Sequence, residues 1–285
     1  IGCSSKMPTY FLGRSHGFNS VHGRMPSVAT GASVANRDLI YLGVSGDGDT
    51  ASIGMGQFVH LIRRNVNMTY IVANNGCYGL TKGQDSATAD LGSFGKSGTQ
   101  NPFEGIDLAS LAVLQGASFV ARSFSGDKEQ LEPLIRAAMA HRGFAFIDVV
   151  SPCVTFANNV GSTKSYAATR ENLEAMPVDF VPMREEIRTQ YKEGSTQTVP
   201  LHDGSIINLH NASTDYKADR REDALVALQA ADRSGKVLTG LLYLDPTSQD
   251  LNHTLELASK PLNSMGKDDL CPGSRVLKSI NEGLR

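Results

Sequence analysis

The sequence predicts an α/β protein built on a doubly wound, mainly parallel sheet, followed by a C-terminal extension. Two observations support this prediction. Apolar strand-like runs alternate with helix-like segments in the first half, and after about residue 155 the sequence becomes polar and charged. Repeated strand–helix–strand units form parallel sheets with helices on both faces. The chain has 285 residues, which is enough to bury a large core.

The first elements follow one another in a regular order. Met25 to Asn36 is rich in small residues and predicts a helix, and the apolar run from Leu39 to Val44 predicts a strand. Ser52 to Asn65 has apolar residues spaced to form one buried helical face. Met68 to Ala73 is a β-rich apolar run, typical of a buried strand.

Four further elements complete the predicted core. In chain order they are a helix at Ile106 to Gln115, a short strand at Ser118 to Ala121, an amphipathic helix at Asp127 to His141 and a buried strand at Phe144 to Val150.

The second half has weaker patterns. Thr169 to Tyr191 is charged, broken helical sequence, and residues 199–209 alternate around an Asp-Gly turn, which predicts a hairpin. Arg220 to Ser234 predicts a helix and Val237 to Asp245 a strand, before a polar tail. We therefore expect an α/β core at residues 1–160, and a C-terminal continuation and extension at residues 161–285 that docks a partner subunit.

Composition and charge argue against several classes of protein. Lysine and arginine total 27 against 29 acidic residues, so no basic excess indicates nucleic acid. No apolar run reaches the roughly 20 residues that span a bilayer, and no secretory signal pattern opens the sequence. The four cysteines (Cys3, Cys77, Cys153 and Cys271) form no CxxC pair, which favours reduced thiols and a cytoplasmic location.

Two turns follow neighbouring predicted strands and contain candidate metal ligands. Asp47 lies in a Gly-Asp-Gly turn after the first strand, and Asn75 lies in an Asn-Asn turn after the second. Because the carboxyl ends of parallel strands share one edge, Asp47 and Asn75 can converge on one cation. Their carboxylate and amide oxygens, with the carbonyl oxygen of Cys77, suit Mg²⁺.

The same turns suit a diphosphate. Gly46 and Gly48 lack a Cβ, so an anion can approach the backbone closely, and the helix expected from about Ser52 directs its first amides toward it. A Gly-Asp-Gly or Asn-Asn turn alone is most often a plain tight turn. Their occurrence at both ends of one strand–helix–strand unit is more specific.

Longer stretches resemble one enzyme family. They are "GCSSK", "HGRMPSVATG", "GDGD", "FVHLIRRNVNMTYIVANN", "YGLTKGQ" and "SPCVTF". Over residues 1–160 the sequence resembles the β subunit of 2-oxoacid:ferredoxin oxidoreductases, which have the thiamine-diphosphate-binding fold. The resemblance implies thiamine diphosphate, Mg²⁺ and one 4Fe-4S cluster as cofactors. It also implies an α subunit, in an αβ or (αβ)2 assembly, whose glutamate activates the aminopyrimidine. This sequence has no clear candidate for that carboxylate.

The resemblance assigns roles to individual residues. Asp47 and Asn75 match the side-chain ligands of Mg²⁺, and Cys77 matches the backbone-carbonyl ligand. Cys3 and Cys153 match two of the four cluster cysteines. The other two belong to a "CPGC" segment, which we expect before Ile1 unless the cluster is incomplete. The further cofactor-binding positions are Gly46, Gly48, Asp49, Gly79, Leu80, Thr81 and Lys6.

Basic side chains near these motifs are candidates for catalytic contacts. Lys82, in "GLTKGQ", is a candidate partner of the substrate carboxylate, and Arg24 and Lys6 are similar candidates. His22 either hydrogen-bonds the diphosphate or the reacting end of the cofactor, or has a structural role.

The resemblance implies CoA-dependent oxidative decarboxylation of a 2-oxoacid, or the reverse reductive carboxylation. The text "RSHGFNSVHGRMPSVATG" and Lys82 favour 2-oxoglutarate, giving succinyl-CoA, CO2 and reduced ferredoxin; pyruvate and branched-chain oxoacids are alternatives. A two-subunit non-redox thiamine-diphosphate decarboxylase would need no cluster, and Cys3 and Cys153 argue against it. A non-catalytic Mg-diphosphate-binding module is the third hypothesis. The expected partners are the α subunit, ferredoxin, the 2-oxoacid and CoA, without nucleic acid or membrane.

Overall fold

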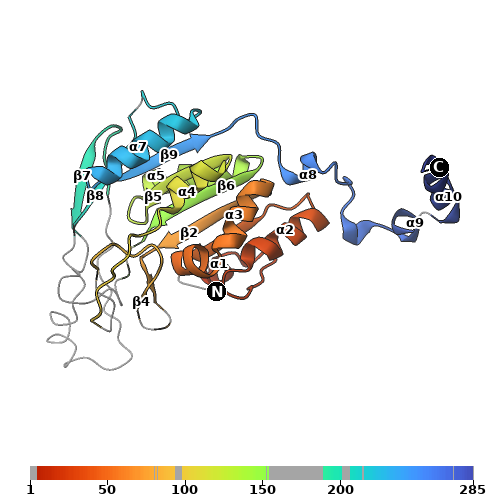
Figure 1. The fold of residues 1–285 in the computed structure, drawn as a ribbon, viewed down its shortest axis with the longest axis horizontal. Coiled ribbons are helices and arrows are strands. Elements are labelled where there is room, and N and C mark those ends of the chain that lie inside the picture. The colour runs from red at the N-terminus through yellow and green to blue at the C-terminus, as the bar shows by residue number, and fades with distance from the viewer. Residues whose placement is uncertain are drawn as a thin grey trace.

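A seven-stranded sheet organises the part of the chain that the structure describes. The computed structural model describes residues 5–79, 81, 83–93, 98–151, 153, 189–200, 206–213, 215–271 and 273–284. The strands lie in the order β1-β2-β6-β5-β9-β8-β7 (Figure 1). They are β1 (Leu42–Gly46), β2 (Met68–Asn74), β5 (Phe119–Phe124), β6 (Phe144–Val150), β7 (Thr196–Pro200), β8 (Ile206–Asn211) and β9 (Val237–Leu244).

Most neighbouring strands are parallel. β1, β2, β6 and β5 all run in one direction. β9 pairs antiparallel with β5, and β8 pairs parallel with β9, so the second half of the chain extends the same sheet. The predicted hairpin is present as the antiparallel pair β7 and β8.

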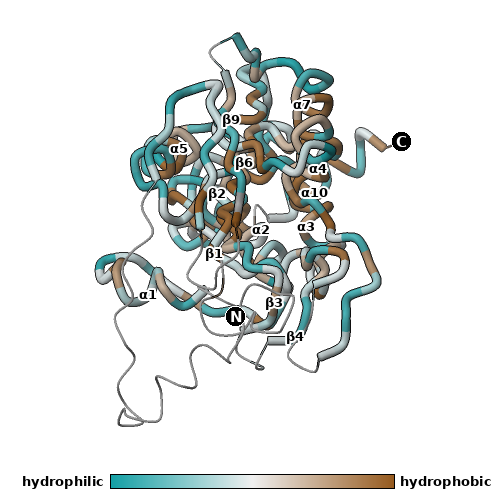
Figure 2. The backbone as a smooth tube through the Cα atoms, turned by 90° about the vertical axis from the view of Figure 1, so that its left-hand side faces the viewer, coloured by the Kyte–Doolittle hydropathy of each residue, from teal (hydrophilic) through white to brown (hydrophobic). Residues whose placement is uncertain are grey.

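Helices cover both faces of the sheet. The helices α2 (Met25–Ala35), α3 (Met55–Arg64), α4 (Leu108–Gln115) and α7 (Arg221–Arg233) pack on one face, and α5 (Lys128–Ala140) packs on the other. Strand β5 divides its side chains between the two faces: Val120 joins the larger core, whereas Phe119 and Ala121 pack with α5. Figure 2 shows hydrophobic residues along β6, α4 and α7. The predicted doubly wound, mainly parallel fold is confirmed.

The turn after β1 differs from the predicted continuous helix. A short π-helical segment, η1 (Gly48–Ile53), begins inside the Gly-Asp-Gly turn, and α3 follows after Gly54. Gly54, where the two segments join, lies at a close approach of two backbones: a Cβ there would lie 2.9 Å from the Cα of Gly23. The helix expected from Ser52 is therefore split at Gly54 and starts four residues earlier.

Short elements complete the described chain. They are α1 (Met7–Phe11), the two-stranded hairpin β3 (Cys77–Tyr78) and β4 (Gln84–Asp85), and the C-terminal helices α8 (Leu251–Thr254), η2 (Leu262–Ser264), α9 (Lys267–Leu270) and α10 (Ser274–Gly283). The C-terminal helices lead away from the sheet (Figure 1). The tail predicted as merely polar is thus partly helical, with exposed apolar side chains on α10. Most of the segment from Thr169 to Tyr191 lies outside the described residues. No helix in the described ranges is long and apolar enough to cross a membrane.

Candidate metal centre

The two predicted turns meet at the carboxyl edge of the parallel strands. Gly46 of β1 is in register with Ala73 of β2, so the next residues, Asp47 and Asn74, lie side by side. The backbone N–H of Asn75 donates to Oδ1 of Asp47 at 3.4 Å. The side chain of Asn75 accepts from the N–H of Cys77 at 3.1 Å, which sets the start of β3 against the same edge. The structure therefore brings Asp47, Asn75 and Cys77 together, as expected.

Asp47 is fully buried and has only neutral hydrogen-bond donors around it. Besides the Asn75 amide, they are the hydroxyls of Ser86 and Thr88, which both donate to Oδ2; the Thr88 contact is 2.6 Å long. No basic side chain of the described chain forms an ion pair with this carboxylate. A buried carboxylate needs a positive partner to offset the cost of its desolvation. The environment of Asp47 therefore fits a bound cation.

The oxygen atoms that could ligate a metal at this edge are also of the types that Mg²⁺ binds. One carboxylate, one amide oxygen and one backbone carbonyl leave the remaining positions of an octahedral ion to phosphate and water. Within the described ranges, no three His, Cys, Asp or Glu side chains form a group that could hold a metal. The expected Mg²⁺ site does not belong to that kind of group, because Asp47 is the single carboxylate among its three protein ligands.

Gly48 is required at its position by an aromatic side chain. A Cβ on Gly48 would lie 2.7 Å from Cζ of Tyr78, and the Tyr78 hydroxyl donates to the Gly48 carbonyl at 3.1 Å. The ring thus packs directly on the Gly-Asp-Gly turn and ties it to β3. This contact explains the glycine within the protein itself, in addition to the expected approach of a diphosphate.

Asp49 is held by His22, from a turn far earlier in the chain. Nδ1 of His22 contacts Oδ1 of the buried Asp49, and the Ser45 hydroxyl donates to Oδ2 at 3.3 Å. Gly23 brings His22 into reach, because a Cβ there would lie 2.8 Å from the backbone nitrogen of Gly54 and its φ is +71°. In this structure His22 is directed at a carboxylate of the protein.

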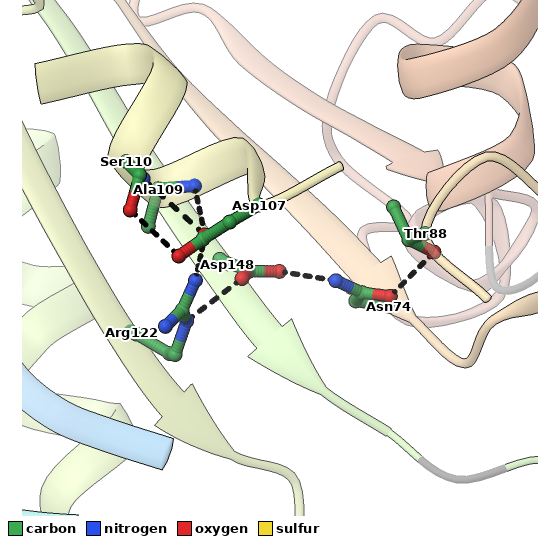
Figure 3. A network of polar contacts seen from close by, with 7 residues as sticks. All are labelled: Asn74, Thr88, Asp107, Ala109, Ser110, Arg122 and Asp148. Carbon is green, nitrogen blue, oxygen red and sulfur yellow. Dashed lines mark hydrogen bonds and ion pairs between the residues drawn. The ribbon is translucent and has the colours of Figure 1, made fainter. Parts of the chain in front are cut away.

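A largely buried ion-pair network joins β5 and β6 and reaches Asn74 at the end of β2 (Figure 3). Nε of Arg122, on β5, donates to Oδ2 of Asp148, on β6, at 2.9 Å, and its Nη2 contacts Asp107. Asp107 also caps α4, accepting from the amides of Ala109 and Ser110 at 3.0 and 3.2 Å. One guanidinium therefore serves two carboxylates.

The two carboxyl groups of this network differ in pKa. Burial would raise the pKa of Asp107, but the charge of Arg122 and the hydrogen bonds from Ser110 outweigh it, so the pKa is lowered. At Asp148 burial outweighs the charge of Arg122, and the pKa is raised. The pKa of Arg122 is raised because the two nearby carboxylates outweigh its burial.

Asn74 connects this network, through Thr88, to the carboxylate of Asp47. Its Nδ2 donates to Oδ1 of Asp148 at 3.1 Å, and its Oδ1 lies 3.0 Å from Oγ1 of Thr88. Figure 3 shows these polar contacts from Asp107 to Thr88. Thr88 in turn donates to Asp47, which extends the chain of contacts to the site. Sequence reasoning missed Thr88 and Asn74 as site residues, and it also missed Ser86, Arg122 and Asp148. The signal for Ser86 and Thr88 was a pair of hydroxyl residues shortly after "GLTKGQ", and the signal for Asn74 was its place in the Asn-Asn turn; Arg122 and Asp148 had no such signal.

The remaining predicted site residues differ in exposure. Cys153 is half-buried, three residues beyond the end of β6, and Ser151 continues that strand by donating to the Asn74 carbonyl at 2.7 Å. Gly79 is buried, whereas Thr81, Arg24 and Lys6 are exposed. Cys3, Leu80 and Lys82 lie outside the described residues, so their predicted roles stay predictions.

Comparison with known proteins places the chain in one family. Residues 1–149 match the family described as "Thiamine pyrophosphate enzyme, C-terminal TPP binding domain". A 2-oxoacid:ferredoxin oxidoreductase subunit beta from Sulfolobus is 38% identical over 207 residues, which are 71% of this chain and 67% of that protein. The 2-oxoglutarate oxidoreductase subunit KorB of Mycobacterium tuberculosis is 42% identical over 55% of this chain, and only 42% of its own length is covered.

A solved structure extends the similarity over nearly the whole chain. The 2-oxoglutarate:ferredoxin oxidoreductase from Magnetococcus marinus, with 2-oxoglutarate, coenzyme A and succinyl-CoA bound, matches 95% of this chain and 79% of its own, with a TM-score of 0.68 and 30% identity. Together with the matched domain family, these relatives show that the chain belongs to the thiamine pyrophosphate-binding enzymes, among the β subunits of 2-oxoacid:ferredoxin oxidoreductases.

Proposed function

We propose that this chain is the β subunit of a 2-oxoglutarate:ferredoxin oxidoreductase. The reaction joins 2-oxoglutarate and CoA to give succinyl-CoA and CO2, and two electrons pass to ferredoxin; the reverse reaction is a reductive carboxylation. The observation that carries the proposal is the meeting of Asp47 and Asn75 at one strand edge, in a fold shared with the enzyme from Magnetococcus marinus. The curated relatives named 2-oxoglutarate oxidoreductase or synthase support the choice of substrate.

In this proposal the described edge binds Mg²⁺ and the diphosphate of thiamine diphosphate. Asp47 and Asn75 supply side-chain oxygens, and Cys77 supplies its carbonyl oxygen. Gly46, Gly48 and Gly79 would border the diphosphate, and Asp49 would hold the turn through His22. The cofactor supplies the carbanion chemistry, and the protein supplies placement and a shielded site.

The electron-transfer part of the proposal rests on the cysteines. Cys153 follows β6 at the same edge as Asp47, so a 4Fe-4S cluster held by Cys153, Cys3 and two further cysteines would lie near the cofactor. Such a cluster would receive electrons singly and pass them to ferredoxin. Thiolate-ligated clusters and reduced cysteines suit a cytoplasmic enzyme.

The proposed α subunit completes the active site. It would supply the glutamate that activates the aminopyrimidine and much of the pocket around the substrate side chain. Lys82, with Arg24 and Lys6 as further candidates, would bind a substrate carboxylate from the β side. We also propose residues 161–285 as the continuation of this subunit toward its partner.

An anaerobic assay tests this function. The chain is purified with its partner subunit, and reduction of a viologen dye is followed with 2-oxoglutarate, pyruvate or a branched-chain oxoacid, each with and without CoA. We expect CoA-dependent reduction with 2-oxoglutarate. Preference for another oxoacid would correct the substrate. Release of CO2 and aldehyde without dye reduction would instead establish the non-redox decarboxylase.

A further inference from the structure

We propose that Ser86 and Thr88 are positioning residues that make Asp47 a ligand through one oxygen only, and that this makes the site selective for Mg²⁺ over Ca²⁺. The inference rests on the proposed cation site and deepens it. It concerns two hydroxyl side chains that lie 39 and 41 residues after Asp47 in the chain and contact its carboxylate directly.

The two oxygens of Asp47 have different surroundings. Oδ2 accepts hydrogen bonds from both hydroxyls, the Thr88 bond being 2.6 Å long. A carboxylate oxygen has about two lone-pair positions, so these two donors fill Oδ2. Oδ1 receives only the amide of Asn75, at 3.4 Å. The oxygen left open to a cation is therefore Oδ1.

The segment from Ser86 to Thr88 is fixed by backbone contacts on both sides. The N–H of Ser86 donates to the Gly76 carbonyl at 3.0 Å, and the N–H of Ala87 donates to Oγ of Ser52 at 3.1 Å. The N–H of Thr88 donates to Oγ of Ser86 at 3.2 Å. Because the backbone is held in this way, the two hydroxyls form a preset cradle for Oδ2.

The buried ion pair fixes the amide of Asn74 beside the cradle. Asp148 is held by Arg122 and faces Nδ2 of Asn74, which turns the amide oxygen of Asn74 toward Thr88. Oγ1 of Thr88 has one proton and three possible acceptors, which are Asp47 at 2.6 Å, Ser86 at 2.9 Å and Asn74 at 3.0 Å. The shortest, charge-assisted contact is the strongest, so the proton goes to Asp47.

Ligation through a single oxygen favours the smaller ion. Mg²⁺ needs near-ideal octahedral geometry at about 2.1 Å and takes few protein ligands, whereas Ca²⁺ accepts six to eight oxygens at roughly 2.3–2.6 Å, often with both oxygens of one carboxylate. Removing a hydroxyl from Oδ2 frees that oxygen for a second bond to the metal. We therefore expect the loss of Thr88 or Ser86 to weaken Mg²⁺ binding and to spare or improve Ca²⁺ binding.

The test measures binding of thiamine diphosphate by calorimetry to the complex of this chain and its partner, after removal of bound cofactor and metal. Each protein is titrated in Mg²⁺ and in Ca²⁺, and the ratio of the two affinities is the readout. We expect Thr88→Val to reduce the Mg²⁺/Ca²⁺ ratio about tenfold, the equivalent of one charge-assisted hydrogen bond. Thr88→Ser keeps the hydroxyl and should therefore bind with the same Mg²⁺/Ca²⁺ affinity ratio as the wild type.

Two further variants keep the test decisive. Ser86→Ala should lower the same ratio, and it replaces Thr88→Val if that variant does not fold. Ser93→Ala is the matched control, since that hydroxyl bonds only to the Asp90 carbonyl of its own turn. An unchanged ratio in folded Thr88→Val or Ser86→Ala overturns the positioning role alone. Wild-type binding that needs no divalent cation overturns the proposed cation site and this inference with it.

Discussion

Asp47 and Asp49 lie two residues apart in one turn, are both buried, and have opposite kinds of partner. Asp47 is surrounded by neutral donors, namely two hydroxyls and an amide. Asp49 contacts His22, a side chain that can itself become positive. A buried carboxylate with neutral donors alone still requires a cation, whereas one beside a histidine can have its charge offset within the protein. This difference supports the proposal that Asp47 binds the cation and that Asp49 holds the turn.

The largest expected effect comes from removing Asp47. Asp47→Ala should weaken cation-dependent thiamine diphosphate binding by more than about a hundredfold, because the charged ligand is lost. The isosteric Asp47→Asn should weaken it as much, although it keeps an acceptor for the hydroxyls of Ser86 and Thr88. Calorimetry in Mg²⁺ measures this loss. Asp90→Ala, at an exposed carboxylate in the loop after β4, is the control. Unchanged binding in folded Asp47→Asn would refute the assignment of Asp47 as a metal ligand.

The second prediction concerns the glycine between the two carboxylates. Gly48→Ala should lower the free energy of unfolding by about 1–3 kcal/mol, because its Cβ would overlap the Tyr78 ring. Urea unfolding measures the change. If the ring is the cause, adding Tyr78→Val should restore part of the loss, as expected for two residues in contact. Additive losses in the double variant would show that another contact requires the glycine.

The third prediction tests the role of Asp49. Asp49→Asn should lower the free energy of unfolding by roughly 1 kcal/mol, because it weakens the contact of a buried carboxylate with the partly exposed His22. His22→Ala should give a similar loss, and the two changes together should cost less than their sum. His60→Ala, at an exposed position of α3, is the control. If Asp49→Asn instead abolished cation-dependent binding at unchanged stability, the division between the two carboxylates would be wrong.

The contrast between Asp47 and Asp49 also shows what the sequence could predict. The meeting of Asp47 and Asn75 follows from local patterns, because each residue ends an apolar strand and parallel strands share an edge. The doubly wound sheet follows from the same alternation. These features depend on short-range periodicity, which the sequence displays directly.

The partners of the two carboxylates could not be predicted in that way. Ser86 and Thr88 reach Asp47 only because the β3–β4 hairpin folds back over the edge, and His22 reaches Asp49 only because Gly23 and Gly54 touch. The Arg122–Asp148 pair depends on the register of β5 and β6. Serine, threonine and histidine have many roles in turns, so nothing in their spacing distinguished these roles.

The smallest expected effect extends the comparison to a second pair of carboxyl groups, the partly exposed Asp107 and the buried Asp148. Arg122 and Ser110 lower the pKa of Asp107 despite its partial burial. The stability that Asp107 contributes is therefore present above the usual carboxyl pKa near 3.8 and is lost as the pH falls through its lowered value. Burial raises the pKa of Asp148, so its contribution has the opposite sign: it is present at low pH and is lost as the pH rises through the raised value.

Neutral variants of these two residues should therefore tilt the pH dependence of stability in opposite directions. Asp107→Asn should flatten the loss of stability on acidification below about pH 4, and Asp148→Asn should steepen the net loss toward low pH. Urea midpoints measured from pH 3 to pH 7 would reveal both slopes, with Asp38→Asn, at an exposed loop position, as the control. Slopes that change in the same direction would mean that Arg122 controls both carboxyl groups alike. The burial difference that separates Asp148 from Asp107 would then have no energetic consequence.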